Sequence, residues 1–183
     1  MLYPTRKLGD VAEVIMGQSP PSSSYNEQGE GLPFFQGKAE FGEIYPTPVK
    51  YCSSPSRIAE ANDVLISVRA PVGNINIARE KSCVSRGLGA LRAKKNILNQ
   101  MFLFYFMKKN ENNWSRLSTG STFSAIKGSN LRNFEIPVPP LKIQKQIVAK
   151  LSAVQDYKKQ LIEQKAKLKE LFDSALAKSI SGK

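Results

Sequence analysis

Residues 136–183 decide how the chain is organised, and they read IPVPPLKIQKQIVAKLSAVQDYKKQLIEQKAKLKELFDSALAKSISGK. After Pro140 no glycine or proline occurs until Gly182, so the stretch predicts one uninterrupted helix. About 38 residues at about 1.5 Å per residue extend about 57 Å, further than a core built from one small chain can cover. Prolines hold the residues before them out of the helical region, which sets the boundary at Pro140. We therefore predict a compact domain over residues 1–140 and a long helical region over residues 141–183.

Apolar residues along this helix alternate at steps of four and three, the spacing of a coiled-coil seam. Lys158 and Lys165 stand where two further apolar residues would fall, and they would either specify an antiparallel register or mark a seam that shifts between faces. The alternative is a helix that folds back on its own domain. The residues predicted to pair two copies of the chain are Ile147, Leu151, Val154, Leu161, Leu168, Phe172 and Ala175.

The chain is strongly basic in both parts. It has 27 basic and 15 acidic side chains, a formal net charge of +12. Residues 1–141 carry 17 basic and 11 acidic side chains and residues 142–183 carry 10 and 4, so each part contributes +6. A positive field of this extent favours a polyanionic partner, nucleic acid first. A basic protein whose lysines are merely solvated is the alternative.

The cysteines and the missing histidines limit the chemistry. Cys52 and Cys83 show no CxxC spacing, and the chain has no histidine, so a zinc site would have too few ligands. Histidine-dependent acid–base and triad chemistry is excluded. Free thiols are expected, with a disulfide left open. Because there is no signal-like N-terminus and no run of about 18 apolar residues, we expect a cytoplasmic protein with no membrane partner.

Short apolar runs separated by turn residues predict a mainly-β domain before residue 95. The strongest is DVLISVR at Asp63–Arg69, which is followed by the turn Ala70-Pro71-Val72-Gly73. The run over residues 44–51 contains Pro46 and Pro48, which restrict it to a sheet edge. Further strands are expected within residues 8–16, 32–37, 74–78, 83–85 and 88–92.

Two helical segments are expected before the long helix. Asn99 is a suitable cap for a helix from Gln100 to about Asn110, whose apolar face would pack on the sheet. Trp114 belongs to a second helical piece. The expected fold class is α+β: a compact, mainly-β domain with packed helices, followed by one long C-terminal coiled-coil helix.

Several segments together resemble the specificity (S) subunits of type I restriction–modification systems. They include Gly17-Gln18-Ser19-Pro20, the run from Asp63 to Gly73, Ser85-Arg86-Gly87-Leu88, Gly120-Ser121-Thr122-Phe123, and Ile136 to Leu141 with Gln144, Ile147 and Leu151. The resemblance covers nearly the whole chain in the family's order. It implies a target recognition domain followed by a helical spacer.

The resemblance also implies a function and partners. S subunits carry two such units and read a bipartite DNA site, whereas this chain shows one unit. It resembles a half-subunit that would form a homodimer on a palindromic DNA site, or pair with a different half-subunit. The chain itself would be non-catalytic. Methyltransferase and restriction subunits would be its partners, and S-adenosylmethionine, ATP and magnesium would bind to them.

Base readout needs side chains that reach base edges, while phosphate contacts only position a protein. Loop-borne arginines, lysines, amides and hydroxyls are therefore the candidates. The expected DNA-contact residues are Gln18, Gln36, Lys38, Arg69, Arg86, Ser121 and Thr122.

Structural roles are the alternatives for most of these residues. Arg69 could instead pair with Asp63 or a backbone carbonyl, and Arg86 has the same ambiguity. Lys38, next to a glycine, could simply be solvated. The segment from Gly120 to Phe123 suits phosphate binding, but it is equally a tight turn that buries Phe123.

Two other functions compete with this interpretation. A stand-alone dimeric DNA-binding regulator would use the same helix and no methyltransferase, so co-purification separates the two. A nuclease would need clustered carboxylates, and Glu60 and Asp63 are not followed by the acid and lysine residues of such a site.

Overall fold

The computed structural model describes residues 3–117 and 125–181, and its first sheet is a four-stranded antiparallel one. Residues of the central strands β7 and β10 are apolar on both faces and almost all are fully buried, as expected for strands covered on two sides. The strand order is β2 (Ala12–Met16), β10 (Leu88–Ala93), β7 (Val64–Ser67) and β8 (Ile75–Ile77).

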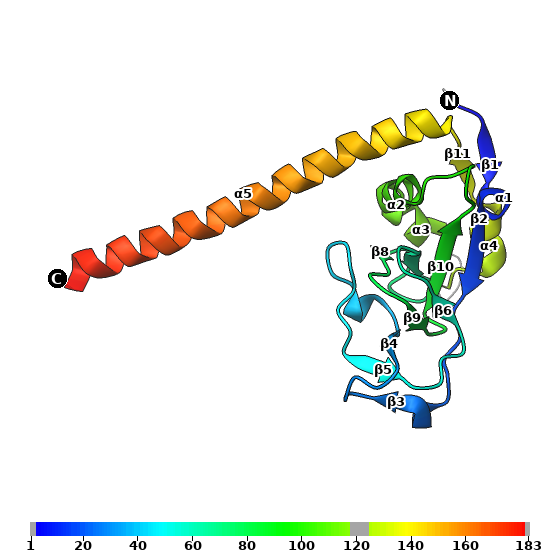
Figure 1. Cartoon of the computed structure of the whole chain (residues 1–183), viewed down its shortest axis with the longest axis horizontal. Coiled ribbons are helices and arrows are strands. Elements are labelled where there is room, and N and C mark those ends of the chain that lie inside the picture. Colours follow the sequence, from blue (N-terminus) through cyan, green and yellow to red (C-terminus); the bar gives the residue numbers. More distant parts are fainter. Residues whose placement is uncertain (1–2, 118–124, 182–183) are drawn as a thin grey trace. The chain divides into compact units, whose positions relative to one another are not determined.

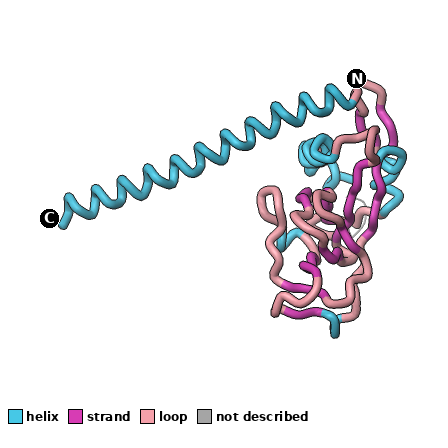
Figure 2. The backbone as a smooth tube through the Cα atoms, viewed as in Figure 1, coloured by secondary structure: helices cyan, strands magenta, loops and turns pink. Residues whose placement is uncertain are grey.

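A second sheet of five short strands is interleaved with the first along the chain, since all of its strands come between β2 and β10 (Figures 1 and 2). It is mixed, because β4 and β9 pair in parallel while its other pairs are antiparallel. Only three residues, Ser85, Arg86 and Gly87, separate β9 from β10, so this turn links the two sheets. The order is β3 (Tyr25–Asn26), β5 (Lys50–Cys52), β4 (Leu32–Phe35), β9 (Ser82–Val84) and β6 (Ile58–Ala59).

One strand expectation is wrong. The sequence predicts an edge strand over residues 44–51, but only β5 forms, and it lies between β3 and β4. The two prolines precede β5, in a loop where Phe41 makes an isolated bridge to Pro46. Because neither proline has to donate within the ladder, they do not confine the strand to an edge.

A small sheet ties the beginning of the compact unit to the segment that precedes α5. Strand β1 (Thr5–Lys7) pairs antiparallel with β11 (Glu135–Pro137), and α1 (Leu8–Val11) contacts α4 (Gly128–Asn133). The backbone N–H of Leu8 also donates to the carbonyl of Phe134 at 2.7 Å. Residues from the beginning of the chain are thereby fixed against residues that come just before the long helix.

Helix α2 (Gln100–Lys109) packs on the first sheet, where it contacts β7, β8 and β10. The predicted cap is confirmed, since the Asn99 Oδ1 accepts from the backbone N–H of Phe102 at 3.0 Å. Four side chains of α2 itself are buried, those of Phe102, Leu103, Phe104 and Met107. Helix α3 (Glu111–Leu117) follows, and its Trp114 ring is fully buried 4.1 Å from the ring of Phe134.

Two short 3₁₀ turns complete the elements. They are η1 (Ser22–Ser24) and η2 (Lys38–Glu40), and each follows or precedes a strand of the second sheet. The fold is α+β, as the sequence predicts. Within the described ranges, no helix has the length and apolar character required to cross a bilayer.

Helix α5 (Leu141–Ser181) begins at the predicted residue and contains 41 residues. By contacts, however, the chain divides between Lys145 and Gln146 rather than at Pro140. The reason is Gln144, which is fully buried and hydrogen-bonded to the compact unit. The first turn of α5 therefore belongs to residues 1–145, and the predicted boundary at Pro140 between recognition domain and spacer stays a prediction.

Candidate nucleic-acid interface

A polar depression of about 590 Å³ opens on the surface of the compact unit. Its walls come from the segment after β2, the segment after β4, the end of β7 and the turn between β9 and β10. Among the described residues that line it there are three cations and no aspartate or glutamate. The lining residues are Ser19, Pro20, Ser22, Tyr25, Gln36, Gly37, Lys38, Arg69, Ala70, Ser85, Arg86 and Gly87.

The depression brings together four residues predicted from the sequence as DNA contacts. Gln36 and Lys38 follow β4, Arg69 follows β7, and Arg86 lies in the turn between β9 and β10. All four side chains are exposed. A concave, cation-lined surface with an amide is chemically suited to phosphate oxygens and base edges.

Three further residues are predicted as DNA contacts: Gln18, Ser121 and Thr122. Gln18 is exposed and lies next in sequence to residues that line the depression, with its backbone N–H donating to the carbonyl of Val84 at 3.1 Å. Ser121 and Thr122 fall outside the described residues. Ala125, the first described residue after them, makes an isolated antiparallel bridge to Arg69.

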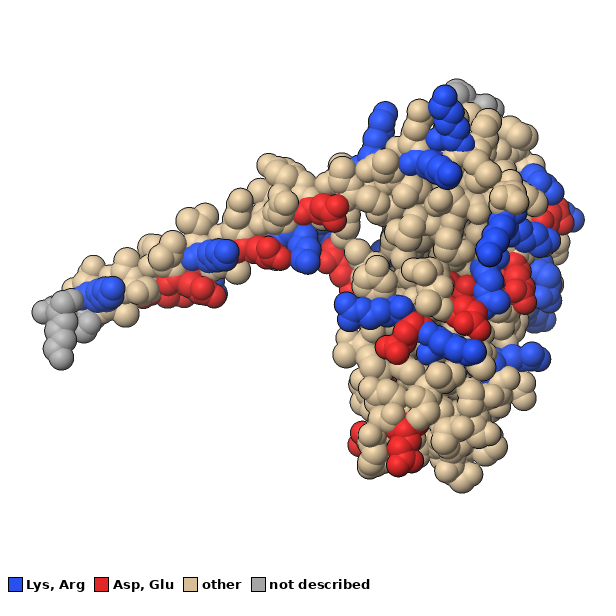
Figure 3. All heavy atoms as spheres, in the orientation of Figure 1, with Lys and Arg blue, Asp and Glu red and all other residues tan. Residues whose placement is uncertain are grey.

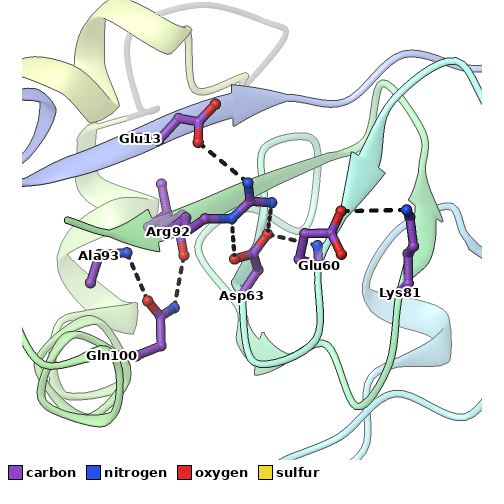
Figure 4. A network of polar contacts seen from close by, with 8 residues as sticks. Glu13, Glu60, Asp63, Lys81, Arg92, Ala93 and Gln100 are labelled. Carbon is purple, nitrogen blue, oxygen red and sulfur yellow. Dashed lines mark hydrogen bonds and ion pairs between the residues drawn. The ribbon is translucent and has the colours of Figure 1, made fainter. Parts of the chain in front are cut away.

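Arg69 has a side chain without a hydrogen bond or ion pair to any described residue. Its suggested structural partner, Asp63, is instead bound by Arg92, whose Nε lies 3.0 Å from Oδ1 and whose Nη2 lies 2.7 Å from Oδ2 (Figure 4). Asp63 Oδ2 also accepts from the backbone N–H of Glu60 at 2.9 Å. The alternative of an Arg69–Asp63 pair is therefore wrong, and the Arg69 guanidinium is left facing the depression.

Arg86 is held at its inner end and open at its outer end. Its Nε donates to the hydroxyl of Ser19 at 3.2 Å, and its backbone N–H lies 3.5 Å from the same oxygen. The terminal nitrogens of the guanidinium have no acceptor among the described residues. Ser19 thus orients the side chain, while its two terminal amino groups remain available to a ligand.

The turn that carries Arg86 is fixed to three neighbouring segments. The backbone N–H of Ser85 donates to Phe35 at 3.0 Å, and the backbone N–H of Val68 donates to Gly87 at 2.8 Å. The backbone N–H of Gly17 donates to Leu88 at 2.9 Å. Ser85 is 3% exposed, so its contacts are shielded from water. The loops bearing Gln36, Arg69 and Arg86 are consequently attached to one buried anchor.

Two glycines permit this close approach. A Cβ at Gly17 would overlap the carbonyl oxygen of Ser85, and a Cβ at Gly87 would overlap the carbonyl oxygen of Gln36. Both contacts are with backbone atoms, which cannot rotate away as a side chain can. These two positions, together with Ser19 and Ser85, are site residues that sequence reasoning did not assign, although they lie within the two short segments it singled out.

Tyr25 forms part of the wall and is a structural residue. Its ring stacks on Phe34 with centroids 4.6 Å apart, and its hydroxyl donates to the carbonyl of Pro20 at 2.8 Å. Burial, assisted by the neighbouring Cys52 and Cys83, raises the pKa of the Tyr25 phenol above its ordinary value. The phenol is therefore neutral at physiological pH and adds no negative charge to the depression.

Further basic side chains lie on the compact unit. Figure 3 shows lysine and arginine over the compact unit in this view, with acidic side chains between them. Several acids on this unit are already paired, Glu13 with Arg92 at 3.4 Å and Glu111 with Lys108 at 2.9 Å. Within the described ranges, no group of three or more metal-ligating side chains occurs.

Helix α5 presents a long apolar face. Leu151, Val154, Leu161, Leu168 and Phe172, all in the predicted pairing set, are 39–67% exposed. Ala175 is also exposed and Ile147 is half-buried. At about 3.6 residues per turn these side chains fall on one side of the helix. The same face is extended by Tyr157, Ile162, Leu171, Leu176 and Ile180, of which sequence reasoning missed Tyr157, Leu171 and Ile180.

The comparison with protein families agrees with the layout of one recognition unit and one helix. A model described as the type I restriction modification DNA specificity domain matches residues 3–171. The chain belongs to the family of type I restriction–modification DNA specificity domains. The family resemblance drawn from the sequence is thereby confirmed.

Relatives within this family are similar along most of the chain. The putative type I restriction enzyme MjaX specificity subunit of Methanocaldococcus jannaschii is 48% identical over 166 residues, covering 91% of this chain and 38% of that protein. The type I restriction enzyme MjaIX specificity subunit of the same organism is 29% identical, covering 93% and 41%. This specificity-domain chain therefore spans less than half the length of these curated relatives.

Solved structures of the family have the same fold. The HsdS subunit from Thermoanaerobacter tengcongensis superimposes with a TM-score of 0.76 at 47% identity, covering 85% of this chain and 37% of that one. A chain from a structure concerned with complex assembly and conformational transition of the type I R-M system gives a TM-score of 0.80 at 46% identity. That match covers 96% of this chain and 45% of the other.

Proposed function

We propose that this chain recognises double-stranded DNA for a type I restriction–modification system and applies the cation-lined depression to the duplex. The observation that carries the proposal is the convergence of Gln36, Lys38, Arg69 and Arg86 from three separate loops on one concave surface without an acidic lining residue. Such a surface attracts phosphates and offers donors to base edges. Membership of the specificity-domain family supports the same role.

The chain acts as a non-catalytic guide in this proposal. Methylation and cleavage belong to a methyltransferase subunit and a restriction subunit, which also bind S-adenosylmethionine, ATP and magnesium. The exposed apolar face of α5 serves a second copy of the chain and the methyltransferase subunit. Two copies related by a two-fold axis would present identical depressions to an inverted repeat, whose half-sites must be spaced near whole helical turns of DNA.

The decisive experiment maps DNA methylation. The chain is co-expressed with the methyltransferase subunit of the same system, and every methylated adenine in the host DNA is located by sequencing. We expect methylation at one bipartite sequence and co-purification of the two subunits. The double variant Arg69→Ala/Arg86→Ala should lose most of this methylation. Lys109→Ala, which removes an exposed cation outside the depression, should retain it.

Two results would contradict the proposal. Sequence-specific DNA binding without any association with the methyltransferase would favour the stand-alone regulator instead. Methylation that is unchanged in the Arg69→Ala/Arg86→Ala variant would show that another surface reads the DNA.

A further inference from the structure

One buried hydroxyl joins the two loops that carry candidate base contacts. The Ser85 Oγ donates to the carbonyl of Gln36 at 2.8 Å and accepts from the backbone N–H of Gly87 at 3.1 Å. The first bond links the segment after β4 to the turn between β9 and β10. The second bond fixes the turn itself, on either side of Arg86. Ser85 therefore sits between the backbone of Gln36 and the backbone of Arg86.

The side chains of Gln36 and Arg86 are in contact with solvent, whereas the Ser85 hydroxyl that links their segments is buried. Gln36 and Arg86 are exposed, whereas Ser85 is 3% exposed. The neighbouring Gly87 shows how closely the segments approach, because a Cβ there would overlap the Gln36 carbonyl oxygen. Reading a base edge requires donors held within about 0.5 Å of a productive geometry. The β4–β9 pairing and the backbone bond from Ser85 to Phe35 bring the two segments together, and the Ser85 hydroxyl adds the bond to Gln36 itself. Gln36 and Arg86 carry an amide and a guanidinium, the two groups best suited to adenine and guanine edges.

We propose that Ser85 is a positioning residue for base readout, and that its hydroxyl holds Gln36 at the spacing from Arg86 that the DNA sequence requires. The inference rests on the proposed function, since it assigns a task within the same depression. Ser85 itself does not contact DNA. It acts through the backbone of Gln36.

This role separates specificity from affinity. Removing the hydroxyl leaves Lys38, Arg69 and Arg86 in the depression, so the attraction for phosphates and its salt dependence persist. What changes is the alignment of the donors with base edges, which alone carry sequence information in direct readout. A merely structural serine would, in contrast, affect binding to every duplex equally.

Ser82, the first residue of β9, provides a matched control three residues before Ser85. It is buried like Ser85, but its Oγ has no hydrogen-bond partner among the described residues. Ser82→Ala therefore removes an equivalent buried hydroxyl without breaking a link between loops. A second variant, Gly87→Ala, tests the same spacing from the other side, because the added methyl displaces the Gln36 carbonyl while the Ser85 hydroxyl remains.

The experiment selects sequences from a pool of DNA duplexes with a randomised central segment, using the full chain with its methyltransferase subunit. The preference is then the affinity for the most enriched duplex divided by that for a scrambled duplex, measured at several salt concentrations. We expect Ser85→Ala and Gly87→Ala to reduce this ratio about tenfold, the discrimination of one good base contact. Affinity for the scrambled duplex and the salt slope should change less than about twofold, and Ser82→Ala should match the wild type in all three quantities.

The outcomes separate this inference from the proposed function. If the wild-type complex enriches no sequence, the proposed function fails and this inference fails with it. If the wild type enriches a sequence and Ser85→Ala keeps the same preference, only the role of Ser85 is refuted. An equal loss on both duplexes would show that Ser85 is structural, and it too would overturn the inference.

Discussion

Arg92 holds both carboxylate oxygens of Asp63, at 3.0 Å from Nε to Oδ1 and 2.7 Å from Nη2 to Oδ2. The bond to Asp63 raises the pKa of the Arg92 guanidinium, and Glu13 adds a second negative charge nearby. The pair joins β10 to the residue before β7. Asp63 therefore has its partner on β10, at the opposite end of β7 from Arg69.

Arg92→Ala should lower the free energy of unfolding by about 2–4 kcal/mol, because it leaves the Asp63 carboxylate buried without its partner. We place the value toward the lower end, since the Arg92 side chain is itself 37% exposed and is partly solvated already. Urea unfolding followed by circular dichroism gives the measurement.

Arg69→Ala is the control for this prediction. Its side chain binds no described residue, so the free energy of unfolding should stay within about 0.5 kcal/mol of the wild type. Equal losses in the two variants would show that Arg69 has a structural partner after all.

Arg69→Ala should instead weaken DNA binding and flatten its dependence on salt. If Arg69 neutralises one phosphate, the slope of log K against log salt should become shallower by about 0.9. Fluorescence anisotropy with a labelled duplex, repeated at several salt concentrations, measures this slope. Lys109→Ala should leave it unchanged, and a parallel shift in both variants would mean that only the overall charge matters.

How much of this site could be predicted depended on where its residues lie in the sequence. Gln36, Arg69 and Arg86 could be singled out because each follows an apolar run or borders a glycine. The depression could not be predicted, because it depends on β4 pairing with β9 across about fifty residues of chain. That parallel pairing brings Gln36 beside Ser85, and no local pattern reveals it.

Two structural expectations from the sequence are wrong: the edge strand over residues 44–51 and the Arg69–Asp63 pair. Pro46 and Pro48 lie in a loop rather than in a strand. Strand β5 begins after them and pairs with β3 on one side and β4 on the other, so it lies inside the sheet. Asp63 and Arg69 border one apolar run, but this run is an extended strand that holds its two ends apart, at about 3.3 Å per residue. The partner of Asp63 comes from β10 instead, and only the register of β10 against β7 shows this.

The buried cysteine pair predicts a loss of stability at alkaline pH. Burial, with a further contribution from Cys52, raises the pKa of the Cys83 thiol to about 12. An unfolded chain releases this proton above about pH 8.5, so in alkali the unfolded state binds fewer protons than the folded state. The stabilisation is fully present below about pH 8.5 and is lost toward pH 12, at no more than about 1.4 kcal/mol per pH unit.

Cys83→Ala tests this prediction. The comparison uses the change in the free energy of unfolding with pH, because the substitution also leaves a cavity that lowers the free energy itself. Urea unfolding at pH 7.5, 8.5, 9.5 and about 10 should show a shallower decline in the variant than in the wild type. Lysine titration contributes to both proteins and cancels in the difference. Parallel declines would mean that the Cys83 thiol does not govern the alkaline loss.

The apolar face of α5 predicts the state of the chain in solution. The full chain should be a dimer by light scattering, and Leu161→Ala/Leu168→Ala should weaken that dimer at least tenfold, since each lost side chain removes about 1–3 kcal/mol of burial. The control Lys159→Ala/Lys167→Ala changes the other side of the helix and should stay dimeric. A full chain that is monomeric without partners would refute self-pairing.

The hydrogen bonds of Gln144 determine where the chain can be truncated without destabilising the compact unit. Its Nε2 donates to the carbonyls of Pro139 at 2.8 Å and Ile97 at 3.0 Å, and its Oε1 accepts from the backbone N–H of Asn99 at 2.7 Å. A chain that ends at Lys145 keeps all three bonds, so we expect it to be monomeric and to have a free energy of unfolding close to that of the full chain. A chain that ends at Pro140 leaves these backbone groups without their partner, which should lower the free energy of unfolding by about 2–3 kcal/mol.

Gln144→Ala in the full chain should show a similar loss while the protein remains dimeric. This variant separates the anchoring of the helix from its pairing. Equal stability of the two truncated chains would place the structural boundary at Pro140.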